Sequence, residues 1–135
     1  TLNDKEILLL KKYDKDIERF DIVVIKYGNS KLVKRVIGLP GESVSYHNNL
    51  LTIDGNHFKE PFLGKVTTDD FNFEDICDVD KCPDGKIPED YYLVLGDNRN
   101  DSNDSRNKKF GLVYKDEIQG LVIFRMWPVN KFGKI

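Results

Sequence analysis

The stretch of sequence that decides the fold reads Leu32-Val33-Lys34-Arg35-Val36-Ile37-Gly38-Leu39-Pro40-Gly41-Glu42. It is an apolar, β-branched run that ends in turn residues, which is typical of a strand that enters a tight turn. Side chains alternate between the two faces of a strand, so Lys34 shares a face with Leu32 and Val36, and Arg35 points the other way. The sequence therefore places two adjacent charges on opposite faces of an apolar strand.

Lys34 supports two interpretations. If its face of the strand is covered, desolvation lowers the pKa of the amine, and the lysine becomes a candidate general base near neutral pH. If the strand lies at an edge, the side chain extends to water and Lys34 is an ordinary surface charge. Alternation alone leaves both interpretations open.

Further strands are indicated by short runs rich in β-branched and aromatic residues and bounded by Gly, Asn or Pro. With the run above, they cover residues 6–10, 21–27, 32–37, 43–47, 50–53, 91–95 and 121–125. Turn residues predict a hairpin and a second tight turn within residues 44–58, and one helical turn is expected at 114–118. The spacing predicts an all-β domain of antiparallel sheets.

Length and composition limit the function classes. The 135 residues suit one domain with one core. A hydrophobic content of 39%, a charged content of 33% and a net charge of −2 indicate a soluble globular chain and no nucleic-acid partner. No apolar run approaches the roughly 20 residues that span a bilayer, and no targeting segment is recognisable.

Residues 60–88 form an acidic, irregular stretch that is long for a connection, so we expect an insertion there. It contains Cys77 and Cys82. A disulfide between them would close a small loop and suit an extracytoplasmic domain, and free thiols are the alternative. A zinc site would need two more soft ligands, and His47 and His57 lie well away in the hairpin region. We expect no metal and no cofactor.

A second polar segment follows the apolar strand at 91–95 and reads Gly96-Asp97-Asn98-Arg99-Asn100-Asp101-Ser102-Asn103-Asp104-Ser105-Arg106. Its aspartates alternate with Arg99 and Arg106, which indicates charge pairs that hold an irregular loop in one geometry. The alternative is a solvated turn whose surface ion pairs contribute about 0 to 1 kcal/mol each. A buried Arg35 would also need a carboxylate partner.

Together the two segments resemble the type I signal peptidases. The first is similar to that family's K-R-x-x-G-x-P-G-[DE] box and the second to its G-D-N-R-x-x-S-x-D-S-R box. Residues 20–25 resemble the family's G-D-[IV]-V-V strand, with Phe20 in place of glycine, and residues 111–113 and 120–128 resemble its closing strands. The resemblance covers nearly the whole chain and implies a signal-peptidase-like β-fold.

The resemblance implies roles for single residues. Lys34 would be the general base and Ser102 the hydroxyl that orients it. Two ion pairs would brace the site: Arg35 with Asp97, and Asp104 with Arg106.

The family's nucleophile is a serine in an S-M-x-P-T box. Thr1 and Leu2 resemble the last letter of that box and the residue after it, which places the serine four residues before Thr1. None of Ser30, Ser43, Ser45, Ser102 and Ser105 occupies the nucleophile's position. We therefore expect a parent protein that is a serine endopeptidase, and a 135-residue chain that is inactive because it lacks the nucleophile and the family's N-terminal membrane anchor.

The substrate class implied by the resemblance is the signal peptide of a secretory preprotein, bound on the extracytoplasmic side of the cell membrane. An extended peptide would add to the strand edge at Lys31, Leu32 and Val33. By resemblance, Leu2, Leu32 and Val33 would line a shallow apolar pocket that accepts small residues. Apolar exposure near this edge would place it against the membrane surface.

Two other classes remain open. One is a non-catalytic homologue that binds secretory peptides, although the presence of both Lys34 and Ser102 argues against it. The other is a Ser/Lys self-cleaving repressor-type domain, which would be cytoplasmic and tethered to a DNA-binding helix-turn-helix. That class would not be expected to carry the second box.

Overall fold

In a computed structural model, the backbone is described for residues 8–11, 17–125 and 133–134, and the side chains for 17–122. The main sheet of this part of the chain has the strand order β1-β9-β2-β3-β7-β8, with β10 paired to β9, and all its pairings are antiparallel. Its strands are β1 (Leu8–Lys11), β2 (Ile22–Tyr27), β3 (Ser30–Gly38), β7 (Tyr91–Leu95), β8 (Val113–Tyr114), β9 (Ile118–Arg125) and β10 (Gly133–Lys134). A short 3-10 helix, η2 (Lys115–Glu117), precedes β9.

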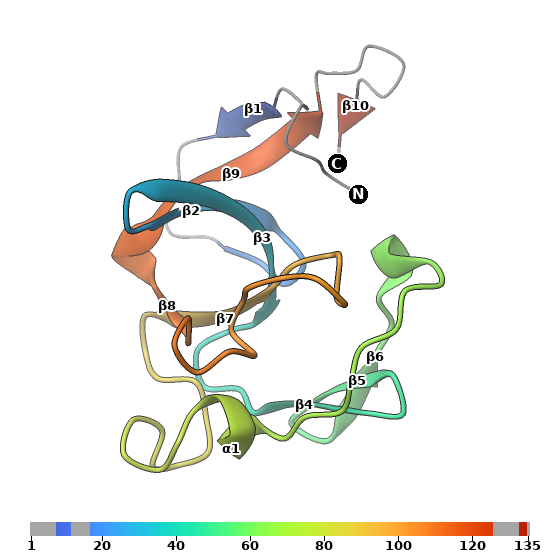
Figure 1. The fold of residues 1–135 in the computed structure, drawn as a ribbon, viewed down its shortest axis with the longest axis vertical. Helices are drawn as coiled ribbons and strands as arrows, with labels where there is room; N and C mark the ends of the chain where they lie inside the picture. The colour runs from blue at the N-terminus through green and yellow to red at the C-terminus, as the bar shows by residue number, and fades with distance from the viewer. Residues whose placement is uncertain (1–7, 12–16, 126–132, 135) are drawn as a thin grey trace.

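A smaller second sheet consists of β4 (Val44–His47), β5 (Leu50–Ile53) and β6 (Asn56–Phe58) in sequential antiparallel order. Figure 1 shows it lying apart from the curled main sheet. Asn48 and Asn49 have φ values of 52° and 64°, so the β4–β5 turn uses the left-handed conformation that asparagine tolerates. The turn between β5 and β6 uses Asp54 and Gly55 in the same region of φ.

Two principal clusters of buried apolar side chains support the sheets. One lies within the main sheet and includes Val23, Val36 and Val94. The other connects the second sheet to the main sheet and includes Ile37, Tyr46 and Leu93. β3 belongs to the main sheet alone, but its neighbouring residues Val36 and Ile37 enter different clusters, so this strand packs on both sides.

The segment 60–88 contributes to the second of these clusters. It contains the 3-10 helix η1 (Pro61–Leu63) and the short helix α1 (Phe73–Ile76). Phe71, Phe73, Ile76 and the Cys77–Cys82 pair are buried in the cluster. Phe71 also forms a β-bridge with Tyr46 of β4. The segment expected to be an insertion therefore shares a core with the second sheet.

The turn after β3 explains part of the first sequence box. A Cβ at Gly38 would lie 2.6 Å from Ile87 Cδ1 and 2.8 Å from Val44 Cγ2. Any side chain at this position would clash with these two residues, so the packing requires glycine. The Glu42 carboxylate accepts hydrogen bonds from the Leu39 amide at 2.7 Å and from both terminal nitrogens of Arg19 at 2.7 Å. This bidentate pair closes the turn.

The predicted all-β antiparallel fold is confirmed. β3 starts at Ser30 and β9 at Ile118, both earlier than expected. In each strand the pairing with β2 extends to residues before the predicted run, since Ser30 pairs with Tyr27 and Ile118 pairs with Ile25. β8 has only two residues, which are too few to show alternation, so the apolar pattern did not predict it. The resemblance of residues 111–113 to a closing strand of the family overlaps it at Val113. The expected strand at 6–10 lies partly, and the motif residues 126–128 lie wholly, outside the described residues.

Candidate active site

Lys34 and Ser102 are brought together by the pairing of β3 with β7. β7 ends at Leu95, which is paired with Arg35, so the loop after β7 begins beside Lys34. The half-buried Lys34 Nζ donates a hydrogen bond to Ser102 Oγ at 3.1 Å. The two sequence boxes thus meet at one lysine–serine contact.

The loop after β7 is folded back on the strand that precedes it. The Ser105 amide donates to the Val94 carbonyl at 3.0 Å, and the Val94 amide donates to Ser105 Oγ at 3.0 Å. The Gly96 amide donates to Asp104 Oδ2 at 3.0 Å. A Cβ at Gly96 would collide with Ser102 Oγ, so the glycine lets the backbone approach the hydroxyl closely.

Asp104 is a buried carboxylate beneath this contact. Burial acts to raise its pKa, but hydrogen bonds from Arg106, Gly96 and the Ser102 hydroxyl outweigh burial and hold the pKa below its ordinary value. Because Ser102 Oγ accepts from Lys34, the single hydrogen of the hydroxyl is available to Asp104, in keeping with the effect of Ser102 on the pKa of that carboxyl. A neutral Lys34 amine held in this way keeps its lone pair free for another proton.

The surroundings of Lys34 lower the pKa of its amine. Burial lowers its pKa, the negative charge of Asp104 opposes that shift, and the positive charge of Arg106 adds to it. Arg106 also neutralises Asp104, because Nε donates to Oδ1 at 2.9 Å and Nη2 donates to Oδ2 at 2.7 Å. The carboxylate whose charge acts on the lysine therefore carries its own counter-charge.

Arg35 joins β3 to the start of the loop. Its Nε and Nη2 donate to the two carboxylate oxygens of Asp97 at 3.0 and 2.7 Å, and Nη1 donates to the Phe20 carbonyl at 3.0 Å. The guanidinium also stacks 4.0 Å from the centre of the Phe62 ring. Each of the three guanidinium nitrogens of the buried Arg35 thus donates a hydrogen bond on the face of β3 opposite Lys34.

Phe20 itself has a φ of 73°, in the left-handed region that favours glycine. In the G-D-[IV]-V-V strand that residues 20–25 resemble, this position is a glycine. The Phe20 ring packs edge-on against Phe62 with 5.1 Å between ring centres. Side-chain packing here accompanies a backbone conformation that is unfavourable for phenylalanine.

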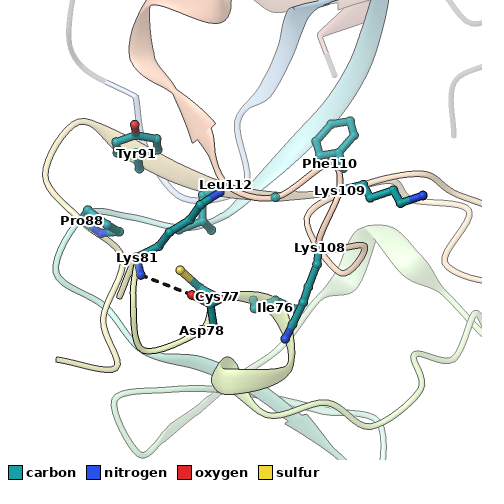
Figure 2. Close-up of a pocket in the computed structure, with 11 residues that line it drawn as sticks. Ile76, Cys77, Asp78, Lys81, Pro88, Tyr91, Lys108, Lys109, Phe110 and Leu112 are labelled. Atoms are coloured by element: carbon teal, nitrogen blue, oxygen red, sulfur yellow. Dashed lines mark hydrogen bonds between the residues drawn. The ribbon is translucent and has the colours of Figure 1, made fainter. Parts of the chain in front are cut away.

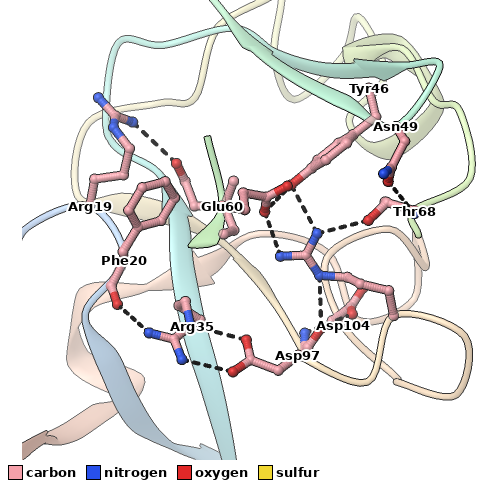
Figure 3. A network of polar contacts seen from close by, with 12 residues as sticks. Arg19, Phe20, Arg35, Tyr46, Asn49, Glu60, Thr68, Asp97 and Asp104 are labelled. Carbon is pink, nitrogen blue, oxygen red and sulfur yellow. Dashed lines mark hydrogen bonds and ion pairs between the residues drawn. The ribbon is translucent and has the colours of Figure 1, made fainter. Parts of the chain in front are cut away.

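The sequence did not reveal the network around Arg99 (Figure 3). The Arg99 side chain is fully buried and pairs with Glu60, with Nη2 2.7 Å from Oε2. Its Nη1 donates to the Tyr46 hydroxyl and to Thr68 Oγ1, each at 2.9 Å, and Nε donates to the Gly96 carbonyl at 2.9 Å. Glu60, Tyr46 and Thr68 lie 31 to 53 residues from Arg99 in sequence, and no local pattern links them to it.

A strand edge lies next to the site. β2 pairs with β3 along its length, whereas β7 pairs with β3 only from Arg35 to Gly38. The β7-facing edge of residues 31–33 therefore has no strand partner within the described ranges. Val33 is 37% exposed and Leu32 is half-buried. Leu2, the other expected pocket residue, lies outside the described residues.

Hollows on the described surface include one beside Ser102 and one beside α1. One, of about 400 Å³, borders Ser102 and is also lined by Asp69, Asp70, Phe71, Arg99, Asn100, Arg106 and Asn107. The other, of about 330 Å³, lies beside α1 and includes Ile76, Lys81 and Leu112 in its lining (Figure 2). Neither Lys34 nor Ser102 lines this second hollow, so it is separate from the lysine–serine contact.

Cys77 and Cys82 are joined by a disulfide. Within the described part of the chain, no three His, Cys, Asp or Glu side chains are grouped as metal ligands would be. The same part of the chain contains no helix with the length and apolar character needed to cross a membrane.

Comparisons with known proteins agree with this arrangement. Residues 1–127 match the family described as signal peptidase, peptidase S26. The chain is 38% identical over 147 aligned residues to signal peptidase I of Bacillus amyloliquefaciens, which covers 99% of this chain and 73% of that protein. It is 40% identical to signal peptidase IB of Staphylococcus aureus over 86% of this chain and 64% of that protein.

A solved structure shows the same fold. The crystal structure of a signal peptidase I from Enterococcus faecalis superposes with a TM-score of 0.69 at 36% identity, covering 79% of this chain and 97% of that chain. The similarity is therefore one of sequence and of three-dimensional structure.

Proposed function

The chain belongs to the signal peptidase I family, and we propose that it is the catalytic part of a serine endopeptidase that removes signal peptides through a Ser/Lys dyad. The observation that carries the proposal is the hydrogen bond from the half-buried Lys34 amine to Ser102. Membership of the family implies preprotein substrates. The proposal adds that Lys34 is the general base, that the Ser102 hydroxyl orients it and that the substrate binds along residues 31–33.

The reaction begins with proton transfer from a serine hydroxyl to the neutral Lys34 amine, while the serine oxygen attacks the scissile carbonyl carbon. The tetrahedral intermediate collapses when the Lys34 ammonium donates its proton to the leaving amine, which gives an ester between the serine and the signal peptide. Water then attacks the ester carbonyl while Lys34 accepts the proton of the water. The second tetrahedral intermediate collapses when the ammonium returns this proton to the serine oxygen, so the ester bond breaks, the signal peptide leaves as a carboxylic acid and the serine is regenerated. Ser102 keeps the amine aimed throughout, because its own hydrogen is held by Asp104.

The nucleophile in this proposal is the serine of the family's S-M-x-P-T box, four residues before Thr1. Main-chain amides near that serine would stabilise the oxyanion. A membrane anchor and an extracytoplasmic site of action are part of the same proposal.

The substrate would bind as an added strand along residues 31–33, where β7 no longer covers β3. Lys31, Leu32 and Val33 supply main-chain donors and acceptors and a partly apolar surface. A shallow site of this kind suits small side chains before the scissile bond.

The test is cleavage of a preprotein in detergent by a preparation that carries the serine box ahead of Thr1. We expect one product whose new N-terminus follows a small residue, as read by mass spectrometry, and no product from the Lys34→Ala variant. Equal cleavage by wild type and Lys34→Ala would contradict the proposed function.

A further inference from the structure

The buried Arg99–Glu60 ion pair takes no part in the proton transfers described above. The two side chains are 0% and 7% exposed. Moving two charges out of water costs more than their attraction returns unless hydrogen bonds satisfy both groups, so a buried pair is a poor source of stability. Arg99 nevertheless donates to four different acceptors, which fixes the plane and position of its guanidinium.

The partners of Arg99 are anchored in the second sheet and the segment that follows it. The Tyr46 hydroxyl donates to Glu60 Oε2 at 2.5 Å, and burial raises the pKa of Tyr46 so that it stays protonated. The main chain of Tyr46 exchanges two hydrogen bonds with Phe71, at 2.9 and 3.0 Å. Thr68 is held in turn by its amide, which donates to Asn49 Oδ1 at 2.8 Å. The partners of Arg99 are therefore themselves held by hydrogen bonds outside the main sheet.

One hydrogen bond of this network reaches the backbone of Gly96, which lies against Ser102. Arg99 Nε donates to the Gly96 carbonyl, and the Gly96 amide is held by Asp104, so both polar groups of this peptide position are fixed. A Cβ at Gly96 would meet Ser102 Oγ and would lie 3.5 Å from Lys34 Nζ. A shift of the Gly96 backbone would therefore move the surface against which Ser102 is packed.

We propose that Glu60 and Tyr46 are positioning residues for the Lys34–Ser102 pair, and that they act through Arg99 and the main chain of Gly96. The kinetic part of this inference rests on the proposed function, whereas its effect on the Lys34 amine does not. The second sheet then serves as a fixed support for the general base as well as a part of the core.

Conservative variants test the inference. Tyr46→Phe removes one hydroxyl and keeps the buried ring, and Glu60→Gln keeps an acceptor and removes the charge. We expect kcat for preprotein cleavage to fall about 10- to 100-fold with KM nearly unchanged, because misplacement of a catalytic group slows the chemical step more than binding. Tyr91→Phe and the exposed Glu74→Gln are matched controls outside the network and should keep kcat within about twofold.

The second measurement needs no cleavage. NMR titration of the Lys34 amine in the 135-residue chain should give a higher pKa in Tyr46→Phe and Glu60→Gln than in wild type. If the Gly96 backbone is held less firmly, water reaches Lys34, and the burial that lowers its pKa is reduced. Asp104 and Arg106, the charged groups that act on Lys34 within the described residues, are unchanged in both variants. Where a variant does not fold, Thr68→Val removes a single acceptor of Arg99 and should shift kcat and pKa in the same directions.

The outcomes separate the two proposals. If wild type does not cleave but the variants still raise the Lys34 pKa, the positioning role stands and the proposed function fails. If wild type cleaves and all three network variants match the controls in kcat and in the Lys34 titration, the positioning role is wrong. A loss of activity that only follows the folded fraction in urea, with an unchanged titration, also overturns it.

Discussion

Lys34 Nζ and Ser102 Oγ are 3.1 Å apart although the residues are separated by 68 positions in the sequence. The contact exists because β7 pairs with β3 as far as Arg35 and the loop then turns back over Lys34. A single strand pairing thus brings the lysine of β3 beside the loop after β7, which supplies its hydroxyl partner.

The first prediction concerns the hydroxyl that orients the base. Ser102→Ala should lower kcat about 100-fold with little change in KM, because the Lys34 amine loses its acceptor and its fixed direction. Steady-state cleavage of a preprotein measures both constants. Asn103→Ala, at the exposed neighbouring position, is the control and should be nearly silent; a Ser102→Ala enzyme of normal kcat would exclude the orienting role.

The second prediction concerns pH. Lys34 is inactive when protonated, so the rate should rise with pH through the lowered pKa of its amine. Arg106→Met removes a cation that lowers this pKa and leaves Asp104, which raises it, without its partner. The acid limb of the pH–rate profile should therefore move to higher pH. Lys108→Met, which removes an exposed cation, should leave the limb in place, and an unmoved limb in Arg106→Met would contradict this account of the electrostatics.

The third prediction concerns backbone strain at Phe20. Phe20→Ala and Phe20→Gly both lose the contact with Phe62, but only glycine relaxes the left-handed φ of 73°. Phe20→Gly should therefore be more stable than Phe20→Ala by about 1 kcal/mol. Urea denaturation of the two variants compares their free energies of unfolding. A more stable alanine variant would show that the backbone is unstrained.

The fourth prediction concerns redox state. Cys77 and Cys82 are 5 residues apart and buried in the core of the second sheet. Closing such a short loop should stabilise the fold by about 2 kcal/mol or less, so the Cys77→Ser/Cys82→Ser double variant should fold and unfold at slightly lower urea concentration. Mass spectrometry of alkylated, unreduced protein should find neither thiol modified. Two alkylated thiols would contradict the disulfide.

The sequence predicted the β-fold well because its alternating apolar runs and turn residues are local signals. The contact of Lys34 with Ser102 and the pairs Arg35–Asp97 and Asp104–Arg106 were expected from the resemblance to the signal peptidases. That resemblance could be seen because both boxes are continuous in the chain. The partners of Arg99 were out of reach, since Tyr46 and Glu60 gain their roles only when the second sheet packs against the loop. The participation of residues 60–88 in the core was hidden for the same reason, because their acidic composition reflects the exposed side chains more than the few buried ones.

The central claim, that Lys34 is a neutral general base held by Ser102, is tested most directly by titrating the Lys34 amine by NMR and comparing the result with the pH–rate profile. We predict an amine pKa below the ordinary 10.5 of lysine, coincident with the acid limb of cleavage by the serine-containing protein. A Lys34 amine that titrates at its ordinary pKa, or an acid limb that stays in place when the Lys34 pKa is moved by Arg106→Met, would contradict the account.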